Sequence, residues 1–373
     1  MSLDSMPPIG YRGRIDRVRE AASERGLDGL YVTDLVDIRW LTGFTGSSAT
    51  AAVLPDRLVL VTDGRYRERA EAELAEAGVD AELRVGFTVP EQHALVVDAL
   101  AGIDRVGAEA HSLSHARWEA FAAELRLVAV SGTVEDGRRV KDAGELARIE
   151  RACRCADAAL AEVAPLLADG MTESDVRMEL EYRMRRHGAD GPSYDTIVAS
   201  GPEHAARPHH AATGRRIVKG DTVIIDVGAL VDGYHSDMTR SYVIGDPTAR
   251  QQEIYDLVLA AQVAGMAAVA AGVPARDVDA TCRAIVSDAG YADWYLHSAG
   301  HGVGLQIHED PFEAPTSTAT LRAGDVVTVE PGLYRVGLGG FRVEDLVEVT
   351  ASGARALTSS PKDTPCLPSP PTT

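Results

Sequence analysis

Short apolar runs alternate with amphipathic segments over the first third of the chain. Apolar residues at helical spacing predict helices over Ile15–Glu24, Arg65–Ala77 and Glu91–Ala101. Compact runs rich in small and branched residues predict strands, which are Leu30–Thr33, Ala51–Val53, Leu58–Thr62 and Arg126–Val130. Strands and helices that alternate in this way indicate an α/β domain.

A polar, glycine-containing stretch follows the last of these strands and predicts a domain boundary. Asp142, with Glu145 three residues later, has the pattern of a helix capping box, and apolar residues then recur at helical spacing. A larger second domain therefore begins there. The predicted division is an N-terminal domain, a linker, the larger domain and a Pro-rich, disordered tail, at 1–135, 136–141, 142–358 and 359–373.

The larger domain repeats one order of elements, two helices followed by strands. The first half is predicted to contain helices Gly144–Ala168 and Glu173–Arg186, then strands Thr196–Ala199, Thr222–Ala229 and Tyr234–Ile244. The second half is predicted to contain helices Arg250–Ala271 and Ala275–Ala289, then a Gly/His segment and strands Asp325–Glu330 and Phe341–Val349. The last two strands of each half are expected to form a hairpin, because Asp232-Gly233 in the first half and three glycines in the second are turn signals.

Each predicted hairpin carries two carboxylates. If the first hairpin turns at Asp232-Gly233, Asp226 and Asp237 come nearly opposite one another, with Cβ atoms roughly 5 Å apart. Glu330 and Glu344 occupy the corresponding places in the second hairpin. Facing carboxylates repel, and the usual agents that hold them together are shared protons or cations. Four acids from two like hairpins can then meet at one centre.

Strand parity adds an arginine to this picture. Glu330 is followed by Pro331, which cannot donate to a strand ladder, so the strand is expected to end there with the carboxylate at its rim. On the partner strand Arg342 and Glu344 share a face, because side chains alternate with a period of two. Arg342 is therefore expected to accompany Glu344.

The segment Gly300–Pro311, GHGVGLQIHEDP, supplies two histidines. Glycines flank His301 and let another group approach it closely. His308 lies seven residues later. In an extended chain this odd spacing turns the two imidazoles to opposite faces, so without a bulge they are not expected to bind one ion. One is then expected to bind a metal and the other the substrate. RPHH, at 207–210, contains a third candidate histidine.

Each of these signals is weak by itself. A lone aspartate in a strand is more often a hydrogen-bonded or edge residue than a ligand. Taken alone, His301 is about equally well explained as a metal ligand and as a buried histidine whose hydrogen bonds are satisfied. GHGVG lacks the following helix and lysine of a phosphate-binding loop. The coincidence of five ligand-type residues at symmetric places is what favours a metal centre.

Composition adds exclusions. The net charge of −19 over 373 residues argues against nucleic-acid or anionic-membrane partners, because phosphate binding needs clustered Lys and Arg. Four cysteines without a C-x-x-C pair predict free thiols in a reducing cytoplasm, and the N-terminus lacks the apolar region of a secretory signal. The nearly apolar stretch 257–273 is mostly Ala and Gly, so it is expected to be a buried helix and not a membrane span.

Four motifs, in this order and spacing, resemble the creatinase/aminopeptidase P/prolidase family of M24 metallopeptidases: DVGALVDGYHSDMTR, GHGVGLQIHEDP, TVEPGLY and FRVED. LTGFTGSSA and VTDGRY resemble the N-terminal domain of the same family. The resemblance implies an α/β (α+β) chain in which a smaller creatinase-like α/β domain precedes a pita-bread catalytic domain with a pseudo-twofold repeat. The HEDP and PHH contexts are prolidase-like.

The resemblance also implies a function. The family hydrolyses the peptide bond before proline, in a dipeptide or at the start of a longer peptide, with a water or hydroxide that bridges two divalent metals. Mn²⁺ is the expected metal, with Co²⁺ or Zn²⁺ as alternatives, and a cytoplasmic homodimer is the expected assembly. The implied metal ligands are Asp226, Asp237, His301, Glu330 and Glu344.

Further roles follow from the same resemblance. His209 and His308 would contact the substrate and the transition state, and Glu330 would also relay protons. Arg342 would orient Glu344. Two alternatives share the fold: a metal-free creatinase-like amidinohydrolase and a non-catalytic pita-bread binding module. Both are expected to lack the full ligand set that this sequence has.

Overall fold

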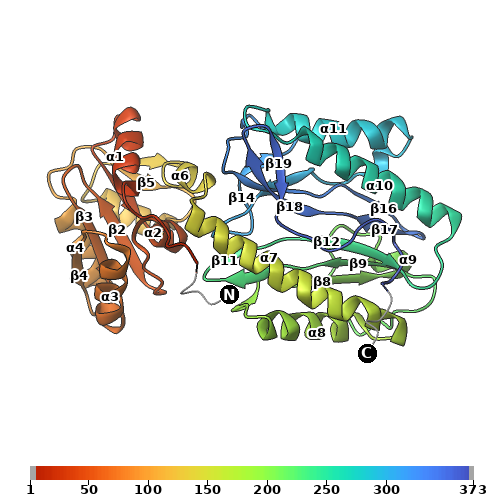
Figure 1. Cartoon of the computed structure of the whole chain (residues 1–373). Coiled ribbons are helices and arrows are strands. Elements are labelled where there is room, and N and C mark those ends of the chain that lie inside the picture. Colours follow the sequence, from red (N-terminus) through yellow and green to blue (C-terminus); the bar gives the residue numbers. More distant parts are fainter. Residues whose placement is uncertain (1–5, 369–373) are drawn as a thin grey trace. The chain divides into compact units, whose positions relative to one another are not determined.

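The structure is a computed structural model that describes residues 6–368. The chain divides into two compact units (Figure 1). The first is Pro8–Arg138, and the second joins residues 6–7 to the chain from Arg139 onward. The division falls within the expected linker, 136–141.

The first unit is built on one six-stranded mixed sheet with the strand order β4-β3-β2-β1-β5-β6. Its strands are β1 Gly29–Val32, β2 Ala49–Val53, β3 Leu58–Thr62, β4 Glu82–Val85, β5 Val106–Glu109 and β6 Leu127–Val130. Its helices are α1 Arg14–Glu24, α2 Leu35–Thr42, α3 Arg67–Ala77, α4 Val89–Ala99, α5 His115–Ala122 and α6 Glu135–Arg139. The predicted α/β class is confirmed.

The second unit contains the two predicted halves. Figure 1 shows α7 and α8 along one side of its strands and α10 and α11 along the other. The helices are α7 Ala143–Val163, α8 Glu173–Arg186, α9 Gly201–His204, α10 Ala249–Ala268 and α11 Ala275–Asp288. The strands of the first half are β7 Gly191–Pro192, β8 Ile197–Ser200, β9 Thr222–Asp226, β10 Ala229–Val231, β11 Tyr234–His235 and β12 Thr239–Val243. Those of the second half are β13 Gly300–Gly302, β14 Glu309–Glu313, β15 Val326–Val329, β16 Gly332–Arg335, β17 Gly339–Arg342, β18 Asp345–Thr350 and β19 Gly353–Ala356.

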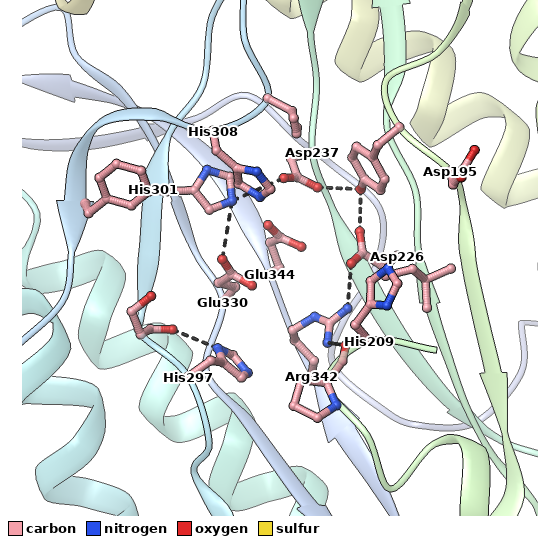
Figure 2. A pocket seen from close by; sticks show the side chains of 16 residues that line it. Asp195, His209, Asp226, Asp237, His297, His301, His308, Glu330, Arg342 and Glu344 are labelled. Atoms are coloured by element: carbon pink, nitrogen blue, oxygen red, sulfur yellow. Dashed lines mark hydrogen bonds and ion pairs between the residues drawn. The ribbon is translucent and has the colours of Figure 1, made fainter. Parts of the chain in front are cut away.

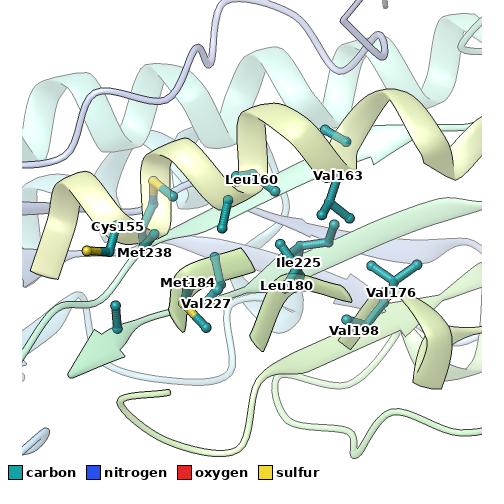
Figure 3. Packing of buried hydrophobic residues seen from close by; sticks show 14 of the residues in the cluster. Cys155, Leu160, Val163, Val176, Leu180, Met184, Val198, Ile225, Val227 and Met238 are labelled. Atoms are coloured by element: carbon teal, nitrogen blue, oxygen red, sulfur yellow. The ribbon is translucent and has the colours of Figure 1, made fainter. Parts of the chain in front are cut away.

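Each helix pair covers the strands of its own half. α7 begins with the predicted capping box, in which Asp142 accepts from the Glu145 backbone and Glu145 accepts from that of Asp142. The apolar faces of α7 and α8 then pack on β8 and β9, with Leu160, Leu180 and Ile225 among the buried residues (Figure 3). A separate cluster joins α10 and α11 to β15, β17 and β18. Two similar layers therefore support the two hairpins.

The first hairpin has a register that differs from the expected one. β10 and β11 pair around Asp232-Gly233, with Val231 opposite Tyr234, and β9 and β12 continue in the same register. Asp226 therefore faces Thr239. The expectation that Asp226 lies nearly opposite Asp237 is wrong by two residues, because a two-residue turn fixes which residues oppose one another along the whole hairpin. The two carboxylates are diagonal neighbours.

The second hairpin places its two acids directly across from one another. Val329 pairs with Asp345, and Gly332 pairs with Arg342. Glu330 and Glu344 lie between these pairs in the same register, so they are opposite. The turn needs Gly339, which has a φ of 106° and whose Cβ, if present, would lie 2.1 Å from the Thr222 Oγ1 atom.

The predicted disordered tail differs from the structure over residues 359–368. Ser359 and Ser360 each donate backbone and side-chain hydrogen bonds to Asp157. Cys366 forms a parallel bridge with Val243 of β12. Proline content predicted disorder, but tertiary partners hold this segment. The rest of the predicted tail, 369–373, lies outside the described residues.

The described helices include none that is both long enough and apolar enough to cross a bilayer. The apolar stretch 257–273 lies mostly in α10, which buries Ile254, Val258 and Gln262 in the second unit.

Candidate active site

A cavity of 390 Å³ lies at the two hairpins of the second unit (Figure 2). The eight residues that the sequence singled out all line it: His209, Asp226, Asp237, His301, His308, Glu330, Arg342 and Glu344. Asp226 lies in β9, His301 in β13 and Arg342 in β17, and the others lie in the segments between strands. Residues more than 130 positions apart in the sequence are thus brought to one place.

The carboxylates and His301 are close enough to share a cation. His301 Nε2 lies 3.6 Å from Asp237 Oδ2 and 3.5 Å from Glu330 Oε1. Asp237, His301 and Glu344 offer ligand atoms that all lie within 4.8 Å of one another, and these residues are 5%, 8% and 1% exposed. Carboxylate oxygens with one imidazole form a donor set that suits Mn²⁺ and also fits Co²⁺ or Zn²⁺. The residues present therefore fit divalent metals.

The pKa values of the cavity residues also fit a site for cations. Burial raises the pKa of Asp237 well above its usual range, and the charges of Asp226 and Glu330 raise it further. Burial likewise raises the pKa of Glu344, with Asp237 adding to it, and raises the pKa of Glu330 to about 8. Burial lowers the pKa of His301 to about 4, so its imidazole is neutral at pH 7. Gathered carboxylates of this kind are costly to charge unless protons or cations compensate them.

Arg342 brings a buried positive charge to the cavity, and Asp226 is its ion-pair partner. Its Nη2 atom lies 2.6 Å from Asp226 Oδ2, and its Nη1 atom donates to the Pro208 carbonyl at 2.9 Å. Arg342 and Glu344 line the same cavity, and among the described contacts Thr239 links them: Arg342 Nε donates to Thr239 Oγ1, which in turn donates to Glu344 Oε2 at 2.6 Å. Because β9 lies beside β17, the Arg342 guanidinium forms its ion pair with Asp226.

His301 and His308 face the same cavity. Their ring centroids are 4.4 Å apart, with an interplanar angle of 74°. The prediction that they face opposite sides is wrong, because β13 ends at Gly302 and the chain turns before β14 begins at Glu309. Strand parity does not apply across that turn.

Tyr194 and His297 are among the lining residues that the sequence did not reveal, and both make polar contacts. The Tyr194 hydroxyl lies within hydrogen-bond distance of Asp226 and, at 2.5 Å, of Asp237 Oδ1, so it joins the diagonal pair. His297 Nε2 lies 2.8 Å from the Tyr334 hydroxyl, and burial lowers the pKa of this imidazole to about 4. The position of His297 four residues before His301 was the available signal. Tyr194 had none, because its partners come from another strand.

Comparisons with known proteins assign the family. The model of metallopeptidase family M24 matches residues 147–351, which is more than half of the chain, and that of the creatinase/prolidase N-terminal domain matches residues 14–140. The chain belongs to metallopeptidase family M24. The predicted resemblance, and the two-part fold that it implied, are thereby confirmed.

Similar M24 proteins span almost the whole chain. An Xaa-Pro dipeptidase from Pyrococcus furiosus is 33% identical over 353 residues, covering 94% of this chain and 99% of the relative. The solved Xaa-Pro dipeptidase from Bacillus anthracis is 36% identical with a TM-score of 0.91, covering 96% of this chain and all of the other. The solved X-Pro aminopeptidase from Thermotoga maritima is 30% identical with a TM-score of 0.84, covering 95% and 99%. Both kinds of M24 enzyme therefore share this fold.

Proposed function

We propose that this M24 protein is a divalent-metal-dependent peptidase that hydrolyses the bond before proline, with Xaa-Pro dipeptides as its first candidate substrates. The observation that carries the proposal is the cavity in which four carboxylates and His301 converge. The likeness to Xaa-Pro dipeptidases over nearly the full chain supports the substrate class. An Xaa-Pro aminopeptidase activity on longer peptides is the second candidate, supported by the Thermotoga maritima structure.

The proposed metal ligands are Asp226, Asp237, His301, Glu330 and Glu344, which would hold two divalent ions, with Mn²⁺ first and Co²⁺ or Zn²⁺ as alternatives. When bound, such ions supply Lewis acidity, which lowers the pKa of water and polarises the scissile carbonyl. The neutral imidazole of His301 presents a lone pair without first losing a proton. Arg342 balances part of the charge of Asp226 and fixes that carboxylate.

Other residues of the cavity would act on the substrate. His209 and His308 line the cavity and can donate N–H groups to the oxygen that becomes negative when the carbonyl is attacked. Glu330 lies at the end of β15 and can carry a proton to the leaving proline nitrogen, which needs one as the C–N bond breaks. A homodimer in the cytoplasm remains the expected assembly and location.

The proposal is tested with metal-reconstituted protein and three substrates. Mn²⁺-loaded protein is expected to release proline from Ala-Pro. Release of arginine from Arg-Pro-Pro would assign the aminopeptidase activity, and hydrolysis of creatine would support the amidinohydrolase alternative. If neither proline peptide is cleaved with Mn²⁺, Co²⁺ or Zn²⁺, the proposal is wrong.

Asp237→Asn tests the metal centre within the same assay. The variant is expected to lose activity and bound metal while its far-UV circular dichroism stays that of the parent, because Asn keeps the size of Asp but not its charge. Unchanged metal content in this variant would contradict the role of Asp237 as a ligand.

A further inference from the structure

Glu173, the first residue of α8, has a fully buried carboxylate that serves a segment distant from it in sequence. Its Oε1 atom accepts from the Ser200 backbone N–H at 2.9 Å and from Ser200 Oγ at 2.6 Å. Its Oε2 atom accepts from the Thr213 backbone N–H at 3.1 Å and from Thr213 Oγ1 at 2.6 Å. His204 Nδ1 lies 2.9 Å from Oε1. One carboxylate thus binds three separate points of the chain.

These three points are the beginning, the middle and the end of one loop, residues 200–213, which we call the His209 loop. His209 lines the cavity, and the Pro208 carbonyl accepts a hydrogen bond from Arg342. The His204 ring stacks on that of His210, with centroids 3.9 Å apart and an interplanar angle of 17°. Glu173 contacts His204, and His204 stacks on His210. The contacts of Glu173 therefore extend to the residue next to His209.

The carboxylate is held in its charged form. Burial alone would raise the pKa of Glu173, but hydrogen bonds from Ser200, Thr213 and His204 outweigh burial and lower the pKa below its usual range. Arg215 supports the same end of the loop, because its Nη1 atom donates to Ser200 Oγ at 2.6 Å and pairs with Asp221. All the described hydrogen bonds to this buried charge come from one loop, which favours a single arrangement of that loop.

Glu173, His204 and His210 also lie close enough together to suggest a metal site. The carboxylate argues against it. Each oxygen has two lone pairs, and Oε1 and Oε2 each already accept at least two hydrogen bonds from Ser200 or Thr213. A cation would have to displace donors that hold the loop, so the contacts of Glu173 fit a positioning role.

We propose that Glu173 is a positioning residue for His209: its carboxylate closes the His209 loop and sets where the imidazole stands in the cavity. The inference rests on the proposed peptidase function, in which His209 contacts the substrate. Fixing both ends of a loop limits the conformations of everything between them, and a displacement of about 1 Å of a substrate-contacting group can cost about 100-fold in rate.

The first test is Glu173→Gln, which keeps the shape of the side chain and removes its charge. Its amide nitrogen cannot accept the hydrogen bonds at one end of the loop. We expect kcat/KM for the proline substrate to fall by roughly 10- to 100-fold, with metal content unchanged. Glu145→Gln is the matched control, because Glu145 is another buried glutamate at a helix start, but it accepts from Asp142 and Tyr234. That variant is expected to keep parental activity.

A double-mutant cycle asks whether Glu173 acts through His209. If it does, Glu173→Gln should lower kcat/KM by less than about twofold when His209 is already Asn, because the group that it positions is gone. Multiplicative losses in the double variant would overturn the proposal. A merely structural role would give such losses.

Hydrogen–deuterium exchange of the His209 loop keeps the proposal separate from the peptidase function. Faster exchange over residues 201–213 is expected in Glu173→Gln and not in Glu145→Gln. Unchanged exchange would overturn the positioning role even if the enzyme cleaves proline peptides. Faster exchange in a protein that cleaves none would refute the proposed function and retain the loop assignment. Thr213→Val, which removes one donor at one end, gives the same readout if Glu173→Gln does not fold, and is expected to show a smaller increase.

Discussion

At the scale of single residues, Asp237 shows how the cavity differs from the rest of the protein. It is 5% exposed, it lies beside other acids, and burial raises its pKa well above the usual range. A charged carboxylate that is buried for a structural role is paired with a cation or accepts several hydrogen bonds, as Glu173 does from the two ends of the His209 loop. Asp237 has instead the Tyr194 hydroxyl and the neutral imidazole of His301. These surroundings would stabilise the charged form of Asp237 only if a cation bound beside it.

We expect Mn²⁺ binding to the metal-free protein at pH 7 to release protons. Glu330, with a pKa of about 8, holds a proton at pH 7 in the metal-free state, and a cation displaces it. The raised pKa values of Asp237 and Glu344 favour the protonated forms of these two groups in the same way. His301, with a pKa of about 4, releases none. The apparent affinity should therefore rise with pH. Titration calorimetry in two buffers of different ionisation enthalpy measures the protons released, and a value of zero would contradict the raised pKa values.

The candidate residues themselves could be found in the sequence, because the residue types and motif spacings that mark them are local. Their partners could not. The pairing of Arg342 with Asp226 depends on two hairpins lying side by side, and no spacing along the chain encodes it. The same holds for Tyr194, whose contacts come from β9 and from the residues before β12.

At the scale of elements, turn chemistry decided which predictions succeeded. The two hairpins were recognised from their glycines and apolar runs, and the second one has its acids opposite as expected. The strands β4 (ELRV) and β5 (VGAE) were missed, because charged residues or glycine interrupt the compact apolar run that marked β1 and β3. The relation of His301 to His308 was wrong, because the chain turns where an extended strand was assumed.

Gly300 in β13 shows how closely these elements approach one another. A Cβ at this position would lie 2.1 Å from the Thr328 carbonyl oxygen of β15 and 2.9 Å from Glu313 Oε2. We expect Gly300→Ala to push β13 away from β15, moving His301 relative to Glu330 and costing about 1–3 kcal/mol of stability. Metal affinity should fall with it, as measured by thermal unfolding and by metal titration.

Gly353→Ala in β19 is the matched control. A Cβ there would meet nothing within 4 Å among the described residues. Its unfolding temperature and metal affinity should stay near those of the parent. Equal effects of the two substitutions would show that the close approach at Gly300 is not what matters.

At the scale of the whole chain, the segment after β19 joins the core of the second unit. Arg240, buried in β12, donates to the Ser360 carbonyl through Nε at 2.9 Å and pairs with Asp345 at 2.7 Å. Lys362 pairs with the other oxygen of Asp345. Composition predicted disorder for this segment. The contact of Ser360 with the buried Arg240 could not be foreseen, because the two residues are far apart in the sequence.

This network predicts an acid-sensitive contribution to stability. Burial alone would raise the pKa of Asp345, but Arg240 and Lys362 hold it below its usual range. The folded state therefore binds the proton more weakly than the unfolded state, so the contribution is present above the ordinary aspartate pKa and is lost as pH falls through the lower, folded value. Asp345→Asn should lower the unfolding temperature at pH 7 and leave a flatter dependence on pH in acid.

Thermal unfolding followed from about pH 7 to about pH 3 measures this dependence. Asp256→Asn, on the exposed face of α10, is the control, because its carboxylate accepts only a surface hydrogen bond from Gln252 among the described contacts. If both variants show the same pH dependence, the network around Asp345 is not its source.

The two hairpins differ in how their acids face one another, and this difference bears on how metal ions would bind. Glu330 faces Glu344 squarely, whereas Asp226 and Asp237 are two residues out of step, and Arg342 already engages Asp226. The four carboxylates come from two similar hairpins but are not arranged symmetrically. Two ions bound among them would therefore not occupy equivalent sites. An ion that took Asp226 as a ligand, as proposed, would share that carboxylate with Arg342. We therefore expect stepwise filling, with one ion retained through dialysis and the other readily exchanged.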